Sequence, residues 1–224
     1  MKPPHSLTSV IYKRQQLFYN CAVVTERERV GGREAQRLET RQRVYEVAIA
    51  EFKRVGISAA DIGAIVTEAG VARGTFYFHF PTKEHVLAEL ERSEQARMAG
   101  ELRKFLDKPH DLRSALAEVV RLVIAIERRL GRVLFRDMLA LHFSPSRPEG
   151  DGWQDYPVIV LVVEEIRRAR EVGEAHPGAD PQHSASFFLV TLYALLITST
   201  DTKALRNAAL DNLLAMVIRG LEPR

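Results

Sequence analysis

The chain has 224 residues, of which 46% are hydrophobic and 27% are charged, and its formal net charge is +3. These proportions are typical of a globular protein, and no run approaches the ~20 consecutive apolar residues of a membrane-spanning helix. The single cysteine, Cys21, excludes an internal disulfide framework and a zinc site made of cysteines alone. Because the first residues also lack a signal-peptide pattern, we expect a reduced cytoplasmic protein with no membrane segment.

The charge is distributed unevenly along the chain. Residues 1–83 carry 13 Lys or Arg and 8 Asp or Glu, a net charge of +5, whereas residues 84–224 carry 19 and 21, a net charge of −2. A basic head on a slightly acidic body is expected if the head binds a polyanion such as DNA. A solvated basic arm would produce the same distribution, so the charge supports DNA binding without deciding it.

Residues 1–36 form a basic N-terminal extension. Arg27 and Arg33 are among its basic side chains, and apolar clusters lie at 10–12 and 17–19. Three interpretations remain open: an arm that enters the minor groove of DNA, a segment whose apolar clusters dock on the rest of the protein, or a stretch upstream of the true start codon.

The rest of the chain predicts helices and no strand. Hydrophobic residues recur at helical spacing, and no strand-type alternation is present that would make a hairpin of the Asp-Gly pair at 151–152. Asp61, Thr82 and Asp155 are expected helix caps. The predicted helices cover about residues 40–54, 61–68, 72–79, 83–106, 111–129, 130–143, 157–172, 183–200 and 203–220. The fold class is therefore all-α, with about nine helices.

A tight turn joins two short predicted helices within residues 56–90. The turn contains Gly70, which suits a backbone conformation that a side chain would penalise. In the helix that follows, Ala72, Phe76 and Phe80 are spaced at i, i+4 and i+8. We expect these three residues to face the protein interior.

The opposite arc of the same helix is expected to face outward with Gly74, Thr75, Tyr77 and Phe78. Exposed aromatic side chains are unfavourable unless that face meets a partner. Arg73 stands at the N-terminal end, where recognition helices usually contact base edges. Gly74 costs about 1 kcal/mol of helix stability, which is explained if the backbone must approach a phosphate or the wall of a groove closely.

This stretch resembles the DNA-binding domain of the TetR (tetracycline-repressor) family, a helix-turn-helix that ends in a short, aromatic-rich recognition helix. The resemblance covers about residues 40–90. It implies a three-helix DNA-binding domain at 37–82, after the extension at 1–36, and a helical ligand-binding and dimerisation domain at 83–224. The matching residues are Ile65, Ala69-Gly70-Val71, Gly74-Thr75-Phe76-Tyr77, His79-Phe80 and Lys83-Glu84.

The resemblance also implies individual roles at the DNA. Arg73 would contact a base, most simply the edge of a guanine, and Phe78 would meet a thymine methyl group. Phosphates would be contacted by Thr75, Tyr77 and His79, and by Lys83 from the start of the next helix. The complete set of DNA-binding candidates is Arg73, Gly74, Thr75, Tyr77, Phe78, His79 and Lys83.

The sequence departs from the family pattern at two places. Ala72 stands where the family usually has Ser or Thr, so that a capping hydroxyl is missing. The preceding helix starts at Ala60-Asp61 instead of at a Thr, and it contains Gly63. Asp61 can cap the helix, but a carboxylate near DNA phosphates is unfavourable. We expect the fold to be kept, whereas the phosphate contacts are open.

The last two predicted helices, 183–200 and 203–220, are the expected dimer interface. Residues 187–197 are too apolar on all sides for the surface of a monomer. In the family the corresponding helices pair with their symmetry mates as a four-helix bundle. The expected partners are therefore a second copy of the chain and a palindromic, double-stranded DNA operator read by two heads.

A small-molecule effector is expected to bind among the helices between about 102 and 193. Such pockets are apolar with few polar anchors, so a hydrophobic, aromatic or acyl effector fits best, although each candidate residue could instead be plain core. The candidates are Leu122, Ile126, Phe135, Met138, Leu139, His142, Trp153, Tyr156, Val162, Phe188 and Tyr193.

The sequence therefore predicts a one-component transcriptional regulator, most simply a repressor that the effector releases from DNA. A DNA-bound organiser or division-control protein with the same fold and no effector is the alternative. An enzyme is disfavoured, because no phosphate-binding glycine loop, nucleophile elbow or His/Glu metal motif is present. We expect no cofactor and no metal site.

Overall fold

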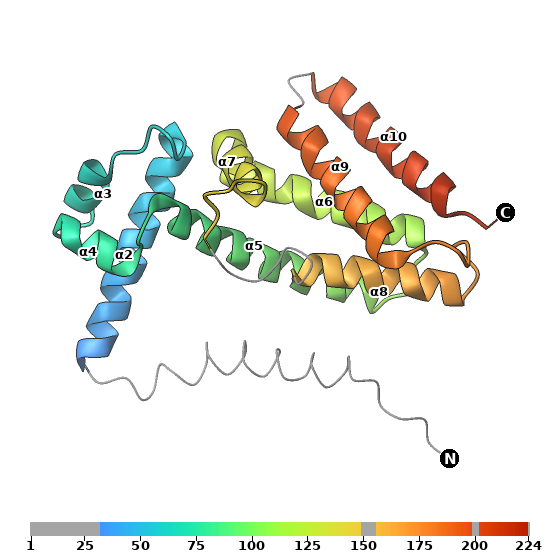
Figure 1. The fold of residues 1–224 in the computed structure, drawn as a ribbon, viewed down its shortest axis with the longest axis horizontal. Coiled ribbons are helices and arrows are strands. Elements are labelled where there is room, and N and C mark those ends of the chain that lie inside the picture. Colours follow the sequence, from blue (N-terminus) through green and yellow to red (C-terminus); the bar gives the residue numbers. More distant parts are fainter. Residues whose placement is uncertain (1–31, 149–155, 199–201, 224) are drawn as a thin grey trace, which may run out of the picture. The chain divides into compact units, whose positions relative to one another are not determined.

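The computed structural model describes residues 32–148, 156–198 and 202–223, so that most of the N-terminal extension and the effector candidate Trp153 lie outside the described residues. The described residues form nine helices and no strand, which confirms the prediction of an all-α fold (Figure 1). Contacts divide the chain into two units, residues 1–46 and 47–224.

The first described helix is longer than the sequence pattern predicted. Helix α2 spans Gly32–Val55, so it begins within the predicted extension and not near residue 40. Side-chain pairs one turn apart support its early turns: Arg37 binds Glu34 at 2.9 Å, and Gln42 donates to Glu46 at 2.8 Å. Since no proline or glycine interrupts the run after Gly32, nothing stops the helix before Gly56.

Two short helices follow, α3 (Ile62–Glu68) and α4 (Arg73–His79). Asp61 caps α3 as predicted, with its carboxylate accepting from the Gly63 N–H at 2.8 Å. The turn between the helices has Gly70 at φ +65°, the left-handed conformation for which glycine was expected. Helix α4 begins without any side-chain cap.

One sequence-based expectation for α4 is wrong. Ala72 is exposed, whereas Phe76 and Phe80 are fully buried as predicted. The reason is that Ala72 precedes the helix in an extended conformation, with φ −73° and ψ 153°, so the helical spacing does not apply to it.

Six helices follow within residues 47–224: α5 (Lys83–Leu106), α6 (Leu112–Leu130), α7 (Arg132–His142), α8 (Pro157–Glu171), α9 (Pro181–Thr198) and α10 (Lys203–Leu221). Helix α5 packs against α6, α7 and α8, and α9 packs against α8 and α10. Their bounds agree with the predicted ranges within two residues at nearly every end. Thr82 stands at the N-cap of α5, but its hydroxyl pairs with the His85 ring at 3.1 Å and does not cap the helix.

The core of this body is built from apolar stripes on the six helices. The predicted stripe on α6 is entirely buried: Leu112, Leu116, Val119, Val123 and Ile126. Burying a Leu, Ile or Val side chain contributes roughly 1.5–3 kcal/mol, so these stripes fix how the helices pack. Over the described part of the chain, no helix combines the length and apolarity needed to cross a bilayer.

Candidate DNA-binding face and effector site

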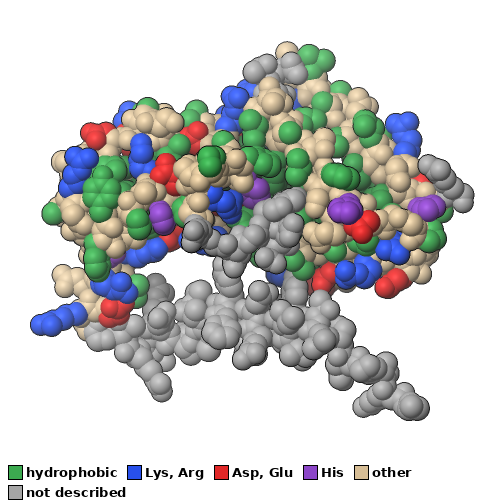
Figure 2. Space-filling view, viewed as in Figure 1, with side chains coloured by type: hydrophobic (Ala, Val, Ile, Leu, Met, Phe, Trp, Pro, Cys, Tyr) green, Lys and Arg blue, Asp and Glu red, His purple; other side chains and the backbone are tan. Residues whose placement is uncertain are grey.

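Helix α4 has one face in the core and one face in solvent. Tyr77 and Phe78 expose 42% and 70% of their surface, and Arg73 and Gly74 are exposed as well. Figure 2 shows hydrophobic side chains at the surface over α3 and α4, next to Lys and Arg side chains. A short helix that leaves two aromatic rings beside basic groups in solvent has a surface suited to a nucleic acid.

The aromatic residues of the outward face of α4 pack against neighbouring rings. The ring of Phe76, which is fully buried, meets Tyr77 edge-on at 5.6 Å and lies 6.1 Å from Phe80. Phe78 packs edge-on against the ring of His79 at 5.0 Å. Tyr77 and Phe78 therefore each contact one neighbouring ring and leave the rest of their surface in solvent.

Lys83, predicted to reach a phosphate, is placed differently from the other DNA-binding candidates. Its ammonium donates to the carbonyl oxygens of Ile57 at 2.6 Å and Ala60 at 3.1 Å, and it lies 3.5 Å from that of Ser58. The side chain thus closes the loop between α2 and α3. A phosphate contact by Lys83 stays a prediction, and it would have to share the ammonium with this loop.

The same loop is attached to helix α7. The Ile57 N–H donates to the Asp137 carboxylate at 2.7 Å. Gly56, at φ +83°, leaves only 3.2 Å between the position of an added Cβ and Asp137 or Val133, so only glycine fits there without strain. Lys53, near the end of α2, donates to the carbonyl of Arg129 at 2.9 Å. The loop that precedes the helix-turn-helix is therefore held to α7 by the hydrogen bond from the Ile57 N–H to the charged Asp137 carboxylate.

The described effector candidates have buried side chains and are spread over four helices and the residue before α8. They come from α6 (Leu122 and Ile126), α7 (Phe135, Met138, Leu139 and His142), the residue before α8 (Tyr156), α8 (Val162) and α9 (Phe188 and Tyr193). Three of them meet through their rings: His142 lies 5.2 Å from Tyr156 and 5.7 Å from Tyr193.

A buried polar cluster surrounds these three rings. The carboxylate of Glu91 on α5, only 3% exposed, contacts Nδ1 of His142 and accepts a hydrogen bond from the Tyr156 hydroxyl at 3.2 Å. Arg147 lies 3.2 Å from the same carboxylate. Burial raises the pKa of Tyr193 to about 12; a hydrogen bond from Gln95 opposes the shift, and the Glu91 carboxylate adds to it. Tyr193 therefore stays a neutral phenol at physiological pH.

Sequence reasoning missed Glu91, Gln95 and Arg147. Glu91 and Gln95 belong to a stretch predicted only as one long helix, and no role was predicted for either of them or for Arg147. A signal was present nonetheless. Glu91 lies on the stripe formed by Leu87 and Met98, which are buried. A carboxylate in an apolar stripe is expected to have a buried partner.

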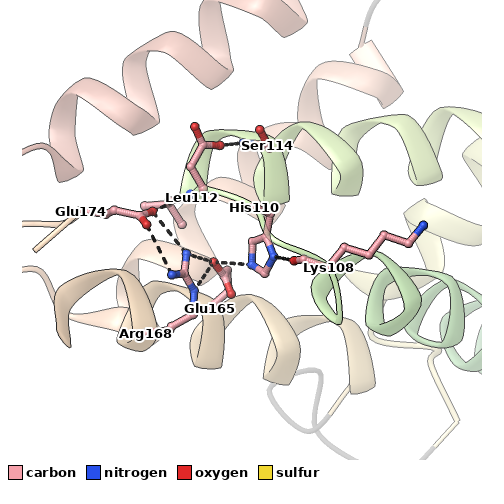
Figure 3. Close-up of polar contacts among 8 residues, drawn as sticks. Lys108, His110, Leu112, Ser114, Glu165, Arg168 and Glu174 are labelled. Atoms are coloured by element: carbon pink, nitrogen blue, oxygen red, sulfur yellow. Dashed lines mark hydrogen bonds and ion pairs between the residues drawn. The ribbon is translucent and has the colours of Figure 1, made fainter. Parts of the chain in front are cut away.

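A second polar network joins α6 and α8 (Figure 3). His110 lies between the Lys108 carbonyl, 2.6 Å from Nδ1, and Glu165, 3.1 Å from Nε2, close enough for an ion pair but not aligned for a hydrogen bond. Glu174 accepts from the Leu112 N–H at 2.8 Å, at the start of α6. The hydrogen bond to Glu165 raises the pKa of Arg168. These contacts fasten the loops at this end of the body.

Glu165 also borders an apolar packing gap between α5, α6 and α8 that is too small to hold a water molecule. Val162 is the effector candidate that lines it. Over the described residues, no three His, Cys, Asp or Glu side chains group closely enough to hold a metal ion.

Comparison with known proteins places the head in a family. Residues 44–90 match the model of the bacterial regulatory proteins of the tetR family. The HTH-type transcriptional regulator AcrR of Shigella flexneri is 36% identical over 97 residues, covering 41% of this chain and 45% of that protein. The HTH-type transcriptional repressor KstR of Mycolicibacterium smegmatis is 38% identical over 90 residues, covering 36% and 43%. The matched part spans less than half of these relatives.

The fold extends the likeness beyond the head. Thermus thermophilus FadR, a TetR-family transcriptional repressor solved in complex with lauroyl-CoA, superimposes with a TM-score of 0.65 at 19% identity over 82% of this chain and 96% of that one. Bacillus subtilis FadR, solved in complex with stearoyl-CoA, gives a TM-score of 0.62 at 16% identity, over 81% and 99%. The head, residues 44–90, matches the tetR family model, and the described helices share the fold of these solved repressors.

Proposed function

We propose that this protein is a transcriptional regulator, most simply a repressor, that binds operator DNA through α3 and α4. The observation that carries the proposal is the outward face of α4, where Arg73, Tyr77 and Phe78 are exposed over a fully buried aromatic base. The match of residues 44–90 to the tetR family model and the relatives named as transcriptional regulators support it.

In the complex, α4 lies in the major groove. In this proposal Arg73 donates two hydrogen bonds to a guanine, and Phe78 contacts a thymine methyl group. Thr75, Tyr77 and His79 bind phosphates and set the register without reading sequence. The missing side chain of Gly74 lets the backbone approach the DNA, and no atom lies within 4 Å of the position that a Cβ would take there.

The regulator binds as a homodimer through α9 and α10. Both helices leave large apolar side chains in solvent in the single chain: Phe187 is 71% exposed on α9, and Met216 is 67% exposed on α10. Pairing these helices with a second copy would bury such residues. Two heads related by a two-fold axis would then read a palindromic operator, with half-sites separated by about 34 Å.

A small hydrophobic or aromatic effector controls DNA binding. Structural neighbours solved with acyl-CoA ligands support the presence of a ligand site in a body of this fold. Helix α7 carries both His142 of the buried cluster and Asp137, which holds the loop before α3. A ligand that moves α7 therefore shifts the equilibrium between DNA-binding and released states, by as much as its affinities for the two states differ.

The proposal is tested by titrating the protein into DNA from its own upstream region and into random DNA, at several salt concentrations. We expect specific binding that weakens steeply with salt. Arg73→Ala should lose about 1–3 kcal/mol of binding free energy and most of its discrimination, whereas Tyr77→Phe should weaken binding to all sequences alike. Fluorescence anisotropy measures both effects. If the wild type binds no DNA sequence more tightly than random DNA across its genome, the proposal fails.

The same assay separates this function from that of an organiser without an effector. A ligand that lowers the affinity for operator DNA without unfolding the protein identifies a sensor. An organiser would keep its DNA affinity in the presence of every ligand that binds the body.

A further inference from the structure

Four glutamates are buried in the described part of the body: Glu91, Glu94, Glu127 and Glu165. A buried carboxylate is tolerated only if it is paired, and each of the four faces a guanidinium. Three of these guanidinium groups belong to helical residues. Arg129 on α6 faces Glu94, Arg206 on α10 faces Glu127, and Arg168 on α8 faces Glu165.

The partner of Glu91 is different. Arg147 lies in the non-helical stretch that follows α7, and its side chain keeps 21% of its surface exposed. Its guanidinium lies 3.2 Å from the Glu91 carboxylate and 5.2 Å from the centre of the Tyr156 ring, over the face of that ring. A carboxylate and an aromatic face together form the usual recognition surface for an organic cation.

None of the other side chains described around this carboxylate carries a permanent positive charge. The Tyr156 hydroxyl is a neutral donor, and His142 carries a charge only when it is protonated. Tyr193, which packs edge-on against His142, is kept neutral by burial. Arg147 is therefore the one permanent cation among the side chains described at Glu91, and its departure would leave the carboxylate without full compensation.

Arg147 can leave without disturbing a helix. Its side chain contacts Glu91, the Tyr156 ring and, at 3.4 Å, Nδ1 of His142. Its backbone N–H bonds the carbonyl of Ser144 within the same stretch, so the helical ladders do not depend on it. A guanidinium that swings into water regains its hydration, whereas Glu91 stays fixed on α5.

We propose that Arg147 is an internal occupant of a cation-binding subsite formed by Glu91 and the ring of Tyr156, and that an organic monocation of the guanidinium or amidinium class takes its place as the effector. The effector role rests on the proposed function. The cation binds Glu91 and stacks on Tyr156, and its apolar part lies against the neighbouring buried rings. A neutral or anionic molecule cannot displace Arg147, because it would leave Glu91 unpaired. Next to the cluster, Oε1 of Gln95 is a buried acceptor without a hydrogen-bond partner in the described structure, and it suits a further N–H donor.

The test removes the Arg147 side chain from the subsite and measures whether a small cationic probe binds in its place. Benzylguanidinium is titrated into the wild type, Arg147→Ala and the double variant Arg147→Ala/Glu91→Gln, in the absence of DNA. Benzylurea serves as the uncharged probe of similar shape. Arg121→Ala is the matched control, because it removes an arginine from an exposed pair with Glu118. Isothermal titration calorimetry measures affinity, and thermal melting measures the shift of Tm.

We expect benzylguanidinium to bind Arg147→Ala at least tenfold more tightly than the wild type or Arg121→Ala and to raise its Tm. The double variant should lose this gain, and benzylurea should bind none of the proteins. If Arg147→Ala does not fold by itself, Arg147→Gln keeps most of the stem and is judged by the same criteria. Equal affinity for the wild type, the Arg147 variant and the double variant, or no binding to any of them, overturns the proposal. Operator binding by the wild type is measured separately, so a failure here leaves the regulator hypothesis standing.

Discussion

The sequence predicts that Lys83 contacts DNA, whereas in the structure its side chain binds the loop between α2 and α3. Its ammonium donates to two carbonyls and lies near a third, all at the loop between α2 and α3. Replacing it with Met keeps the apolar stem and leaves these acceptors with water only. We expect Lys83→Met to lower the free energy of unfolding by about 1–3 kcal/mol in urea denaturation.

Lys104→Met is the control for this prediction. Lys104 pairs with exposed Glu101, so its loss should change stability by less than about 0.5 kcal/mol. If Lys83→Met unfolds like the wild type but shows a shallower salt dependence of DNA binding, the lysine acts at a phosphate and not in the loop.

Tyr193 makes stability depend on alkaline pH. In the unfolded chain the phenol ionises near pH 10, whereas burial keeps it protonated in the folded protein until about pH 12. Between these values the unfolded state releases a proton that the folded state keeps, so stability falls as pH rises. At pH 11 the loss from this residue is roughly 1.4 kcal/mol. The difference in unfolding free energy between the wild type and Tyr193→Phe should shift by that amount between pH 8 and pH 11. A pH-independent difference would show that the phenol ionises alike in both states.

Some residues of the polar cluster around Glu91 could be predicted from the sequence, and others could not. His142, Tyr156 and Tyr193 are among the residues predicted to line an effector pocket, and the structure brings their rings together. Glu91 and Arg147 were not chosen. They are 56 positions apart, and only the packing of α5 against α7 and α8 makes a partner for the carboxylate.

At the scale of the elements, helix positions were predictable because apolar spacing and glycine or proline breaks agree. The stripe on α6 and the turn at Gly70 are examples. The start of α2 was not predictable, since apolar spacing is lost before residue 40, where the helix is supported by polar pairs such as Arg37 with Glu34. The prediction that Thr82 caps α5 was wrong, because its hydroxyl pairs with the His85 ring instead of with a backbone N–H at the start of the helix.

The attachment of the α2–α3 loop to α7 depends on Asp137. Its carboxylate accepts the Ile57 N–H at 2.7 Å, and a hydrogen bond to a charged acceptor is worth about 1.5–3 kcal/mol. Asp137→Ala should therefore speed amide exchange in residues 56–61 by about tenfold or more, as measured by hydrogen–deuterium exchange. Asp137→Asn keeps an acceptor and should exchange nearly as slowly as the wild type. Unchanged exchange in Asp137→Ala would mean that α7 does not hold this loop.

At the scale of the whole molecule, we expect the exposed apolar residues of α9 and α10 to decide the oligomeric state. A charge placed in a buried interface cannot be solvated, so Phe187→Glu combined with Met216→Glu should convert the dimer to a 25.3 kDa monomer. Size-exclusion chromatography with light scattering measures the mass. Operator affinity should fall with it, because a single head contacts one half-site.

Val172→Glu provides the control for the dimer prediction. Val172 is 59% exposed after the end of α8, outside the proposed interface. It should leave the mass and the DNA affinity unchanged. A dimer that persists in the double variant would place the interface on another surface.

The position of Arg147 on the chain itself has a consequence for the sensitivity of the regulator. A group tethered by a short stretch of chain competes at an effective concentration on the order of millimolar, which dilution of the protein does not alter. An incoming cation must overcome that local competitor, so its apolar part decides whether it succeeds.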